Sequence, residues 1–411
     1  MEIRPILSTL LRNKTGAVLV AVQVAISLAI LSNALHIVNV RQAVAARPSG
    51  IANEGEVFSI FVRNLVNSGA NEQLANQKRD ADTLRAVAGV VSVANTSQTP
   101  MSRSGSTNSV SVDRKQQTET ASASFYVSPD SLVKTWGMKL VQGRDFRPEE
   151  IIDLDQNTSD AFPDTVIVTR PLAEKMWPGA ASAVGKTVLF GVGEDAKQAR
   201  VIGVVERLQS QQSQVSEQGE YSTIVPVRLI GQPGAMYSVR AEPGQRDRVM
   251  KEAEEALRKS SPTAVILRTK SVDEDRKDRY RADVAMAWML VTVSVLLLLI
   301  TASGIVGMAS LWVQQRRKQI GVRRALGARR VDILRYFITE NVMITSAGVV
   351  AGVLLGVGLN QLLVSQLEMT RLPPGYLAGG AGVFWALGMV AVYGPAWRAA
   401  TISPAMATRS A

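Results

Sequence analysis

The chain has 411 residues, a net charge of +11 and no cysteine. Residues 41–283 carry 32 basic and 31 acidic side chains, whereas the rest of the chain carries 14 basic and 4 acidic ones. The excess charge therefore flanks apolar segments, which argues against a nucleic-acid-binding protein, and the lack of cysteine excludes disulfides.

Four apolar segments are long enough to cross a bilayer, because a hydrocarbon core about 30 Å thick needs roughly 20 apolar residues in a helix. They predict transmembrane helices at residues 16–40, 284–313, 336–365 and 377–397. The alternative is three spans and a re-entrant segment, because the last segment is rich in glycine.

Charge between the spans predicts the topology, since short loops rich in Lys and Arg stay in the cytoplasm. Eight basic residues and one acidic residue lie between 316 and 335. The loop 314–335 and the ends 1–15 and 398–411 are therefore predicted to be cytoplasmic. The region 41–283 and the turn 366–376 then lie outside.

The outer region predicts a mixed α+β domain that folds without disulfides. Strands are expected at 56–62, 90–95, 164–169, 186–192, 199–205 and 263–269, helices at 74–87 and 245–258, and loops or hairpin tips at 102–124 and 209–218. Ser271 and Glu274 fit a capping box for a helix that continues into the second span. If the first helix also extends past the membrane, the two form a stalk; the alternative is a short loop before each span.

Catalytic chemistry is not indicated. The segment 179–187 resembles a phosphate-binding loop but has five residues between its glycines and leads into a strand, so we expect a turn. His36 is the single histidine and lies in the first span, which rules out a zinc site or a His-based triad in one chain. We expect His36 to pack at a helix interface, with a proton relay as the alternative, and Glu340 to be solvated, with a functional buried acid as the alternative. No enzyme, metal site or cofactor site is predicted.

Glycine recurs at every fourth residue of the third span, at Gly348, Gly352 and Gly356. Such a stripe lets another helix approach closely. Packing within the chain and an interface between subunits remain equally good explanations.

The basic segment before the third span is divided by Gly321 and Gly327 and has an apolar residue every three or four positions. This pattern predicts a short amphipathic helix along the inner membrane surface, with a turn at Gly327. The alternative is a charge cluster that only fixes topology and contacts lipid headgroups.

The same segment resembles the FtsX-like permease domain of MacB-type ABC transporters. The matching residues are Arg317, Ile320, Gly321, Arg323, Ala325, Leu326, Gly327, Ala328, Ile333, Leu334, Phe337 and Glu340. Gln319 replaces the usual glutamate, which puts any salt bridge of that acid in doubt. Pro395, Ala399, Ala400, Pro404 and Ala405 fit the family's ending, and FYVSPDSLVKTWGMKLVQGRDF resembles its periplasmic core domain.

The resemblance implies a permease of the bacterial inner membrane that works as a dimer, either of two copies or with a paralogue. In that family an ABC ATPase, which binds ATP and Mg²⁺, drives the permease. Because only residues 1–15 precede the first span, we expect a separate ATPase subunit. Its coupling site would comprise Arg317, Gln319, Ile320, Gly321, Arg323, Arg324, Ala325, Leu326, Gly327 and Ala328.

Movement of the stalk would then drive efflux, with a periplasmic adaptor and an outer-membrane channel as possible partners. A lipoprotein-release permease, an FtsX-like regulator of cell-wall hydrolases and a membrane-anchored ligand sensor are the alternatives. The sequence does not indicate the transported substrate.

Overall fold

The computed structural model describes residues 14–66, 69–232, 234–367 and 370–402. Most of the predicted cytoplasmic ends, including Pro404 and Ala405, lies outside these residues. The described chain divides into two units. One comprises residues 14–43 with 283–402, and the other residues 44–282.

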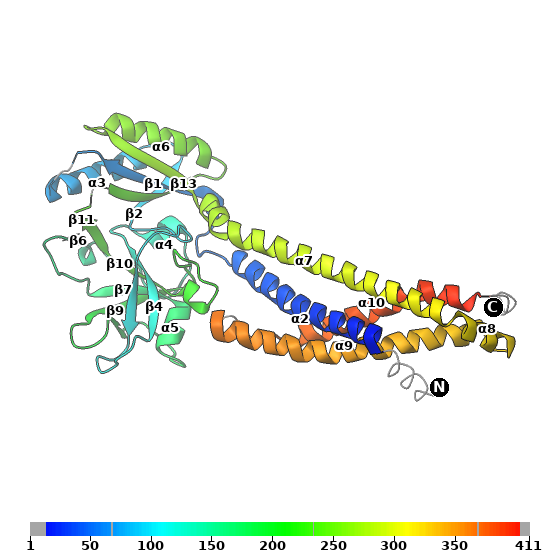
Figure 1. Cartoon of the computed structure of the whole chain (residues 1–411). Helices are drawn as coiled ribbons and strands as arrows, with labels where there is room; N and C mark the ends of the chain where they lie inside the picture. The colour runs from blue at the N-terminus through cyan, green and yellow to red at the C-terminus, as the bar shows by residue number, and fades with distance from the viewer. Residues whose placement is uncertain (1–13, 67–68, 233, 368–369, 403–411) are drawn as a thin grey trace. The chain divides into compact units, whose positions relative to one another are not determined.

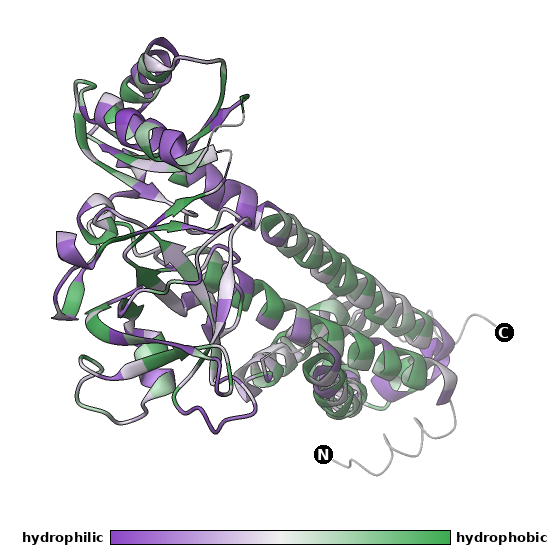
Figure 2. Ribbon diagram, turned by 90° about the vertical axis from the view of Figure 1, so that its left-hand side faces the viewer, coloured by the Kyte–Doolittle hydropathy of each residue, from purple (hydrophilic) through white to green (hydrophobic). Residues whose placement is uncertain are grey.

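The first unit is helical (Figure 1). It contains α8 (Arg317–Ala325), α9 (Arg330–Leu367) and α10 (Pro374–Ala400), together with most of α2 (Lys14–Ala45) and of α7 (Val272–Gln315). Four helices of the described chain are long and apolar enough to cross a membrane, which confirms the four predicted spans. Figure 2 shows their predominantly hydrophobic residues. Helix α9 begins at Arg330, so the last residues of the predicted loop 314–335 are helical.

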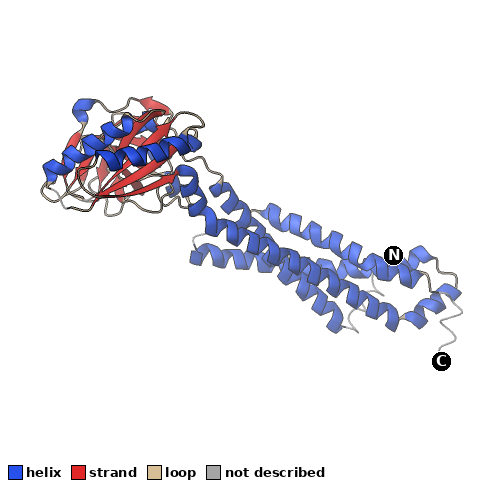
Figure 3. Cartoon of the chain, turned by 90° about the horizontal axis from the view of Figure 1, so that it is seen from above, coloured by secondary structure: helices blue, strands red, loops and turns tan. Residues whose placement is uncertain are grey.

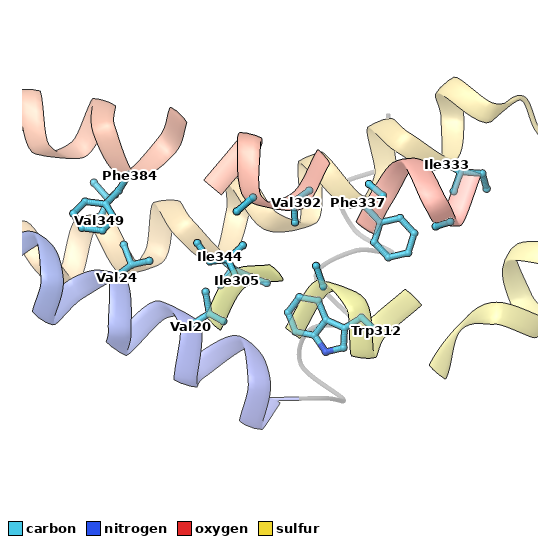
Figure 4. Close-up of a cluster of buried hydrophobic side chains, with 14 of the residues drawn as sticks. Val20, Val24, Ile305, Trp312, Ile333, Phe337, Ile344, Val349, Phe384 and Val392 are labelled. Carbon is cyan, nitrogen blue, oxygen red and sulfur yellow. The ribbon is translucent and has the colours of Figure 1, made fainter. Parts of the chain in front are cut away.

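All four long helices contribute to one buried apolar cluster (Figure 4). Its labelled members are Val20, Val24, Ile305, Trp312, Ile333, Phe337, Ile344, Val349, Phe384 and Val392. Hydrogen bonds also join these helices. The hydroxyls of Ser27 and Thr301 lie 3.0 Å apart, and Asn33 Nδ2 donates to the Gly356 carbonyl at 3.1 Å. Hydrogen bonds of this kind join helices in a membrane, where water is not available as a partner.

The strands that the structure describes all belong to the second unit (Figure 3). An antiparallel sheet has the order β13 (Val265–Ser271), β1 (Val57–Asn64), β12 (Gly234–Ala241) and β2 (Val90–Thr96). Helices α3 (Ala70–Arg85) and α6 (Arg246–Ser260) pack on this sheet. Because side chains alternate along a strand, Phe58, Ile60 and Val62 of β1 share the face that contacts the helices.

The remaining large sheet closes into a barrel, because each strand of the ring pairs with two others. The ring consists of β9 (Lys197–Val205), β7 (Thr165–Thr169), β10 (Ser222–Val225), β4 (Ala121–Val127), β3 (Thr107–Ser111) and β8 (Thr187–Phe190). Strand β5 (Leu140–Gly143) adds to β9, and β6 (Ile152–Asp155) pairs with β11 (Val227–Ile230). The buried apolar side chains of the barrel, from Ala123 and Val166 to Phe190, belong to one core cluster.

The six predicted strands and two predicted helices of this unit are confirmed within a few residues. The prediction of a loop or hairpin tip at 102–124 holds for residues 112–120, which connect the antiparallel strands β3 and β4, but those two strands were not predicted. These strands consist largely of Ser, Thr, Asn and Ala, so they lack an apolar alternation, and hydrogen bonds such as that from Ser111 Oγ to the Gly191 carbonyl (2.8 Å) satisfy their hydroxyls. The segment 179–187 is a turn before β8, as expected.

The start of α7 is fixed by the predicted capping box. The Ser271 amide donates to Glu274 Oε2 at 2.8 Å, and the Glu274 amide donates to Ser271 Oγ at 3.2 Å. Lys270 Nζ contacts Asp275 and Asp278 at 2.8 Å each. Burial raises the pKa of Asp275, although Lys270 opposes that effect. The helix that contains the second predicted span therefore begins in the second unit, at a residue fixed by specific polar contacts.

Ser271→Ala is expected to lower the unfolding free energy by about 1 kcal/mol, because it removes the acceptor for the Glu274 amide. Thermal unfolding of the full chain in detergent measures this loss. Ser216→Ala is the matched control, since Ser216 also precedes a helical turn but its side chain makes no capping bond. Equal midpoints for the two variants would contradict a capping role for Ser271.

Candidate functional site

The basic segment forms a short helix between two long ones, as predicted. Helix α8 is separated from α9 by Gly327, whose φ of +98° lies in the left-handed region that favours glycine. The Gly327 and Ala328 amides donate to the Arg324 and Arg323 carbonyls at 3.2 and 3.0 Å. This ending closes α8 and reverses the chain into α9.

One side of α8, here called the anchored face, is held by an ion pair. Arg316, the residue just before α8, places Nη1 2.7 Å from Glu340 Oε2 of α9. The two side chains are 11% and 1% exposed, so the pair is almost wholly withdrawn from solvent. The expectation that Glu340 is solvated is therefore wrong. The helix that carries it packs against Arg316, a contact that sequence spacing does not indicate.

Aromatic and apolar contacts complete the anchored face. The Arg323 guanidinium lies 5.2 Å from the centre of the Tyr336 ring, and Arg316 Nη1 lies 3.5 Å from Tyr336 Oη. Ile320 is buried in the same cluster as Phe337. The hollow left among these side chains is about 20 Å³, which is room for about one water molecule. The anchored face is therefore closely packed.

A third contact joins α8 to the last span. Arg324 Nη1 donates to the Ala400 carbonyl, in the last turn of α10, at 2.7 Å. A cation at a helix C-terminus satisfies a carbonyl that has no partner within the helix and interacts favourably with the helix dipole. Through Arg316 and Arg324, α8 is thus attached to both α9 and α10.

The opposite side of α8, here called the exposed face, carries an apolar pair one helical turn apart. Val322 is 53% exposed and Leu326 is 83% exposed. Leu326 belongs to the set of residues predicted to couple to an ATPase, whereas Val322 was not predicted. In the rest of that set, Arg317, Gln319, Arg323, Ala325 and Gly327 are exposed, Arg324 and Ala328 are half-buried, and Ile320 and Gly321 are buried. The predicted residues thus lie on α8 and in the turn that follows it, and they are divided between two faces.

The glycine stripe of α9 faces α2 of the same chain. A Cβ added at Gly348 would lie 2.7 Å from the Ala21 carbonyl oxygen, and one at Gly352 would lie 3.0 Å from Ala25 Cα. At Gly356 the nearest atom is a Leu377 methyl at 3.0 Å. The stripe thus lies at an internal helix interface, the first of its two explanations.

His36 also lies at a helix interface. Its Nε2 is 3.1 Å from Thr370 Oγ1, and its ring meets that of Tyr376 edge-on at 5.3 Å between centroids. These partners precede and begin α10. They account for the burial of His36 by hydrogen bonding and packing.

Four apolar helices, with a large α+β unit inserted in the sequence between the first two, define a multi-pass membrane protein. The MacB-like periplasmic core domain matches residues 22–258, and the FtsX-like permease C-terminal family matches residues 291–404. The chain belongs to this family of ABC transporter permeases.

Several relatives carry named export functions. Over 274 residues the chain is 29% identical to a macrolide export ATP-binding/permease protein MacB of Chromobacterium violaceum, which covers 65% of this chain and 40% of that protein. A MacB of Nitrosomonas europaea is 26% identical, covering 70% and 42%. A pyoverdine export ATP-binding/permease protein PvdT of Pseudomonas savastanoi pv. phaseolicola is 34% identical, covering 32% and 20%. The matches to the two MacB proteins thus span about 40% of those proteins.

Proposed function

We propose that this chain is the permease subunit of a MacB-type ABC exporter of the inner membrane, driven by a separate cytoplasmic ATPase that binds ATP and Mg²⁺. The observation that carries the proposal is the division of α8 into an anchored and an exposed face. Val322 and Leu326 leave an apolar pair for a partner, while Arg316 and Arg324 attach the same helix to α9 and α10. A force applied to the exposed face therefore reaches two spans directly.

The proposed mechanism transmits that force outward through long helices. Helix α7 runs without interruption from Val272 to Gln315, and its start is fixed by Ser271 and Glu274. In the proposed mechanism this continuous helix acts as the lever. On this proposal the outer unit lies in the periplasm, and α2 and α7 form the stalk that moves it.

A second permease completes the proposed exporter. Only 17% of the most apolar stretch of α7 is buried within the chain, compared with 56% for α2. Helix α7 therefore has the most surface left for a partner copy or a paralogue, in addition to lipid. A periplasmic adaptor and an outer-membrane channel would receive the cargo. The relatives' names specify different cargoes, macrolides and pyoverdine, so the cargo of this chain is not assigned.

Leu326→Asp tests the exposed face. The substitution is expected to weaken binding of the cognate ABC ATPase by at least about tenfold, because it places a charge where an apolar side chain is buried on association. Nucleotide-dependent co-purification and ATPase stimulation in nanodiscs measure the loss. The thermal midpoint of the variant should not change, since Leu326 is 83% exposed in the chain.

Leu65→Asp is the matched control, because Leu65 is 59% exposed but belongs to the outer unit. It should leave ATPase binding intact. If wild-type protein shows no nucleotide-dependent association, or if both variants bind like the wild type, the proposed coupling role of α8 is wrong.

A further inference from the structure

The barrel of the second unit is not continuous in the chain with the long helices. Strand β13 runs directly into α7, and residues 46–56 lead from α2 to β1, so the four-stranded sheet is covalently joined to both helices. The strands of the barrel instead lie in the sequence between β2 and β12 of that sheet. Direct attachment of the barrel to the helices therefore depends on side chains and hydrogen bonds.

A buried glutamine, Gln209, joins the barrel to the end of α2. It belongs to residues 206–221, here called the β9–β10 connection, and it is 0% exposed. Its Nε2 donates to the carbonyls of Arg47 at 2.7 Å and Pro48 at 3.1 Å, just after α2. Its backbone amide donates to the Ser49 carbonyl at 2.8 Å. Both N–H groups of the side chain amide and the backbone N–H are thus used on one short segment.

The same glutamine also contacts α7. Gln209 Oε1 accepts from Tyr280 Oη of α7 at 3.2 Å and from Ser213 Oγ at 2.8 Å, so all four hydrogen-bonding positions of its side chain are filled. Arg279, the preceding residue of α7, donates to the carbonyls of Gln212 at 2.7 Å and Ser213 at 2.9 Å. Two successive residues of α7 therefore hold the β9–β10 connection.

Other hydrogen bonds fix the β9–β10 connection to the strands of the barrel. Tyr126 Oη of β4 donates to the Gln209 carbonyl at 2.6 Å, and Ser222 Oγ of β10 donates to the Leu208 carbonyl at 3.0 Å. Tyr126 and Ser222 are both 0% exposed. Residue 209 is thus bonded at once to a barrel strand, to the segment after α2 and to α7.

We propose that Gln209 is a positioning residue that makes the barrel move as one body with the first turns of α7. A buried polar network that is fully satisfied resists displacement, because movement would leave desolvated donors and acceptors without partners. The part of this role that concerns transport rests on the proposed function. There, movement of α7 reaches the barrel through Gln209, in addition to the four-stranded sheet through the chain itself.

Distances between spin labels test this attachment in the full chain, which has no cysteine of its own. Lys277→Cys on α7 is paired with Lys175→Cys on α5 (Arg170–Met176), a helix that packs on the barrel. A second pair combines Lys277→Cys with Lys251→Cys on α6, which packs on the four-stranded sheet. All three lysines are exposed. In detergent, Gln209→Met should broaden the distance distribution of the first pair at least about twofold and leave that of the second pair unchanged.

Gln211→Met is the matched control, because Gln211 is also buried, at 1% exposed. Its Oε1 accepts from Ser124 Oγ and lies 3.5 Å from Gln98 Nε2, and neither partner belongs to a long helix. Both Gln→Met variants should lower the thermal midpoint, since each loses buried hydrogen bonds. Only Gln209→Met should broaden the first distribution, which separates a positioning role from a purely structural one.

Adding Arg279→Met to Gln209→Met should broaden the first distribution further, because Arg279 holds the same connection. An unchanged first distribution in this double variant would overturn the proposal. Equal broadening of both pairs, or the same broadening with Gln211→Met, would overturn it as well.

A cognate ATPase with ATP should leave the first distance of the wild type unchanged, since the barrel and α7 then move together. A shift of that distance on addition of ATP would contradict movement as one body. If no ATPase binds, the coupling role of α8 is wrong, but the distances measured on the chain alone still decide the role of Gln209.

Discussion

Arg316→Met is expected to destabilise the chain by about 3–5 kcal/mol, because it leaves the Glu340 carboxylate buried without its cation. Removing only one partner of a buried ion pair lowers the free energy of unfolding strongly, because the other charge stays buried without a partner. The double variant Arg316→Met/Glu340→Met should recover most of the loss, since two apolar side chains can replace a buried pair with little net change. Thermal unfolding of Arg316→Met, Glu340→Met, the double variant and the wild type in detergent gives the coupling energy as a double-mutant cycle.

Arg248→Met provides the control for this prediction. Arg248 pairs with Glu252 at 2.7 Å on α6, but both side chains are 45% exposed, so the expected loss is within about 0.5 kcal/mol. A similar small loss for Arg316→Met would show that the pair with Glu340 is not buried in the folded protein. Arg316→Met should also weaken the coupling of the permease to an ATPase, because Arg316 is one of the two arginines that attach α8 to the spans.

Composition alone predicts the membrane helices, because a long uninterrupted apolar segment is compatible with few other structures. Local spacing also predicts α8 and its end at Gly327. An apolar residue at every third or fourth position indicates the helix, and a glycine that can adopt the left-handed conformation indicates its end. Both signals depend only on residues close together in the sequence. The capping box of Ser271 and Glu274 is local in the same sense. These features need no knowledge of tertiary packing.

The attachments of α8 could not be predicted in this way. Arg316 and Glu340 are 24 residues apart, and Arg324 reaches a carbonyl 76 residues away, so both contacts depend on how helices pack. The strands β3 and β4 were missed because hydroxyls and small side chains replace the usual apolar alternation.

Gly348→Leu is expected to destabilise the membrane unit by at least about 1–3 kcal/mol, because a Cβ there would lie 2.7 Å from the Ala21 carbonyl oxygen and 2.8 Å from Val24 Cβ. Neither atom is the end of a flexible side chain, so α2 and α9 must move apart. Gly358→Leu is the matched control on the same helix, since no atom lies within 4 Å of a Cβ at that position. Its thermal midpoint should stay at or above that of the wild type, as leucine favours a helix more than glycine does.

The oligomeric state of the Gly348→Leu variant distinguishes the two explanations of the glycine stripe, packing within one chain and an interface between subunits. If the stripe serves packing within one chain, Gly348→Leu lowers the thermal midpoint while chemical crosslinking between copies persists at temperatures below that midpoint. If instead crosslinking is lost and the midpoint is unchanged, the stripe is an interface between subunits, and its contact with Ala21 and Ala25 does not govern stability. Because close approach of α2 and α9 also sets the position of Glu340 relative to the other helices, the first outcome should reduce ATPase coupling even though Gly348 lies far along the helix from α8.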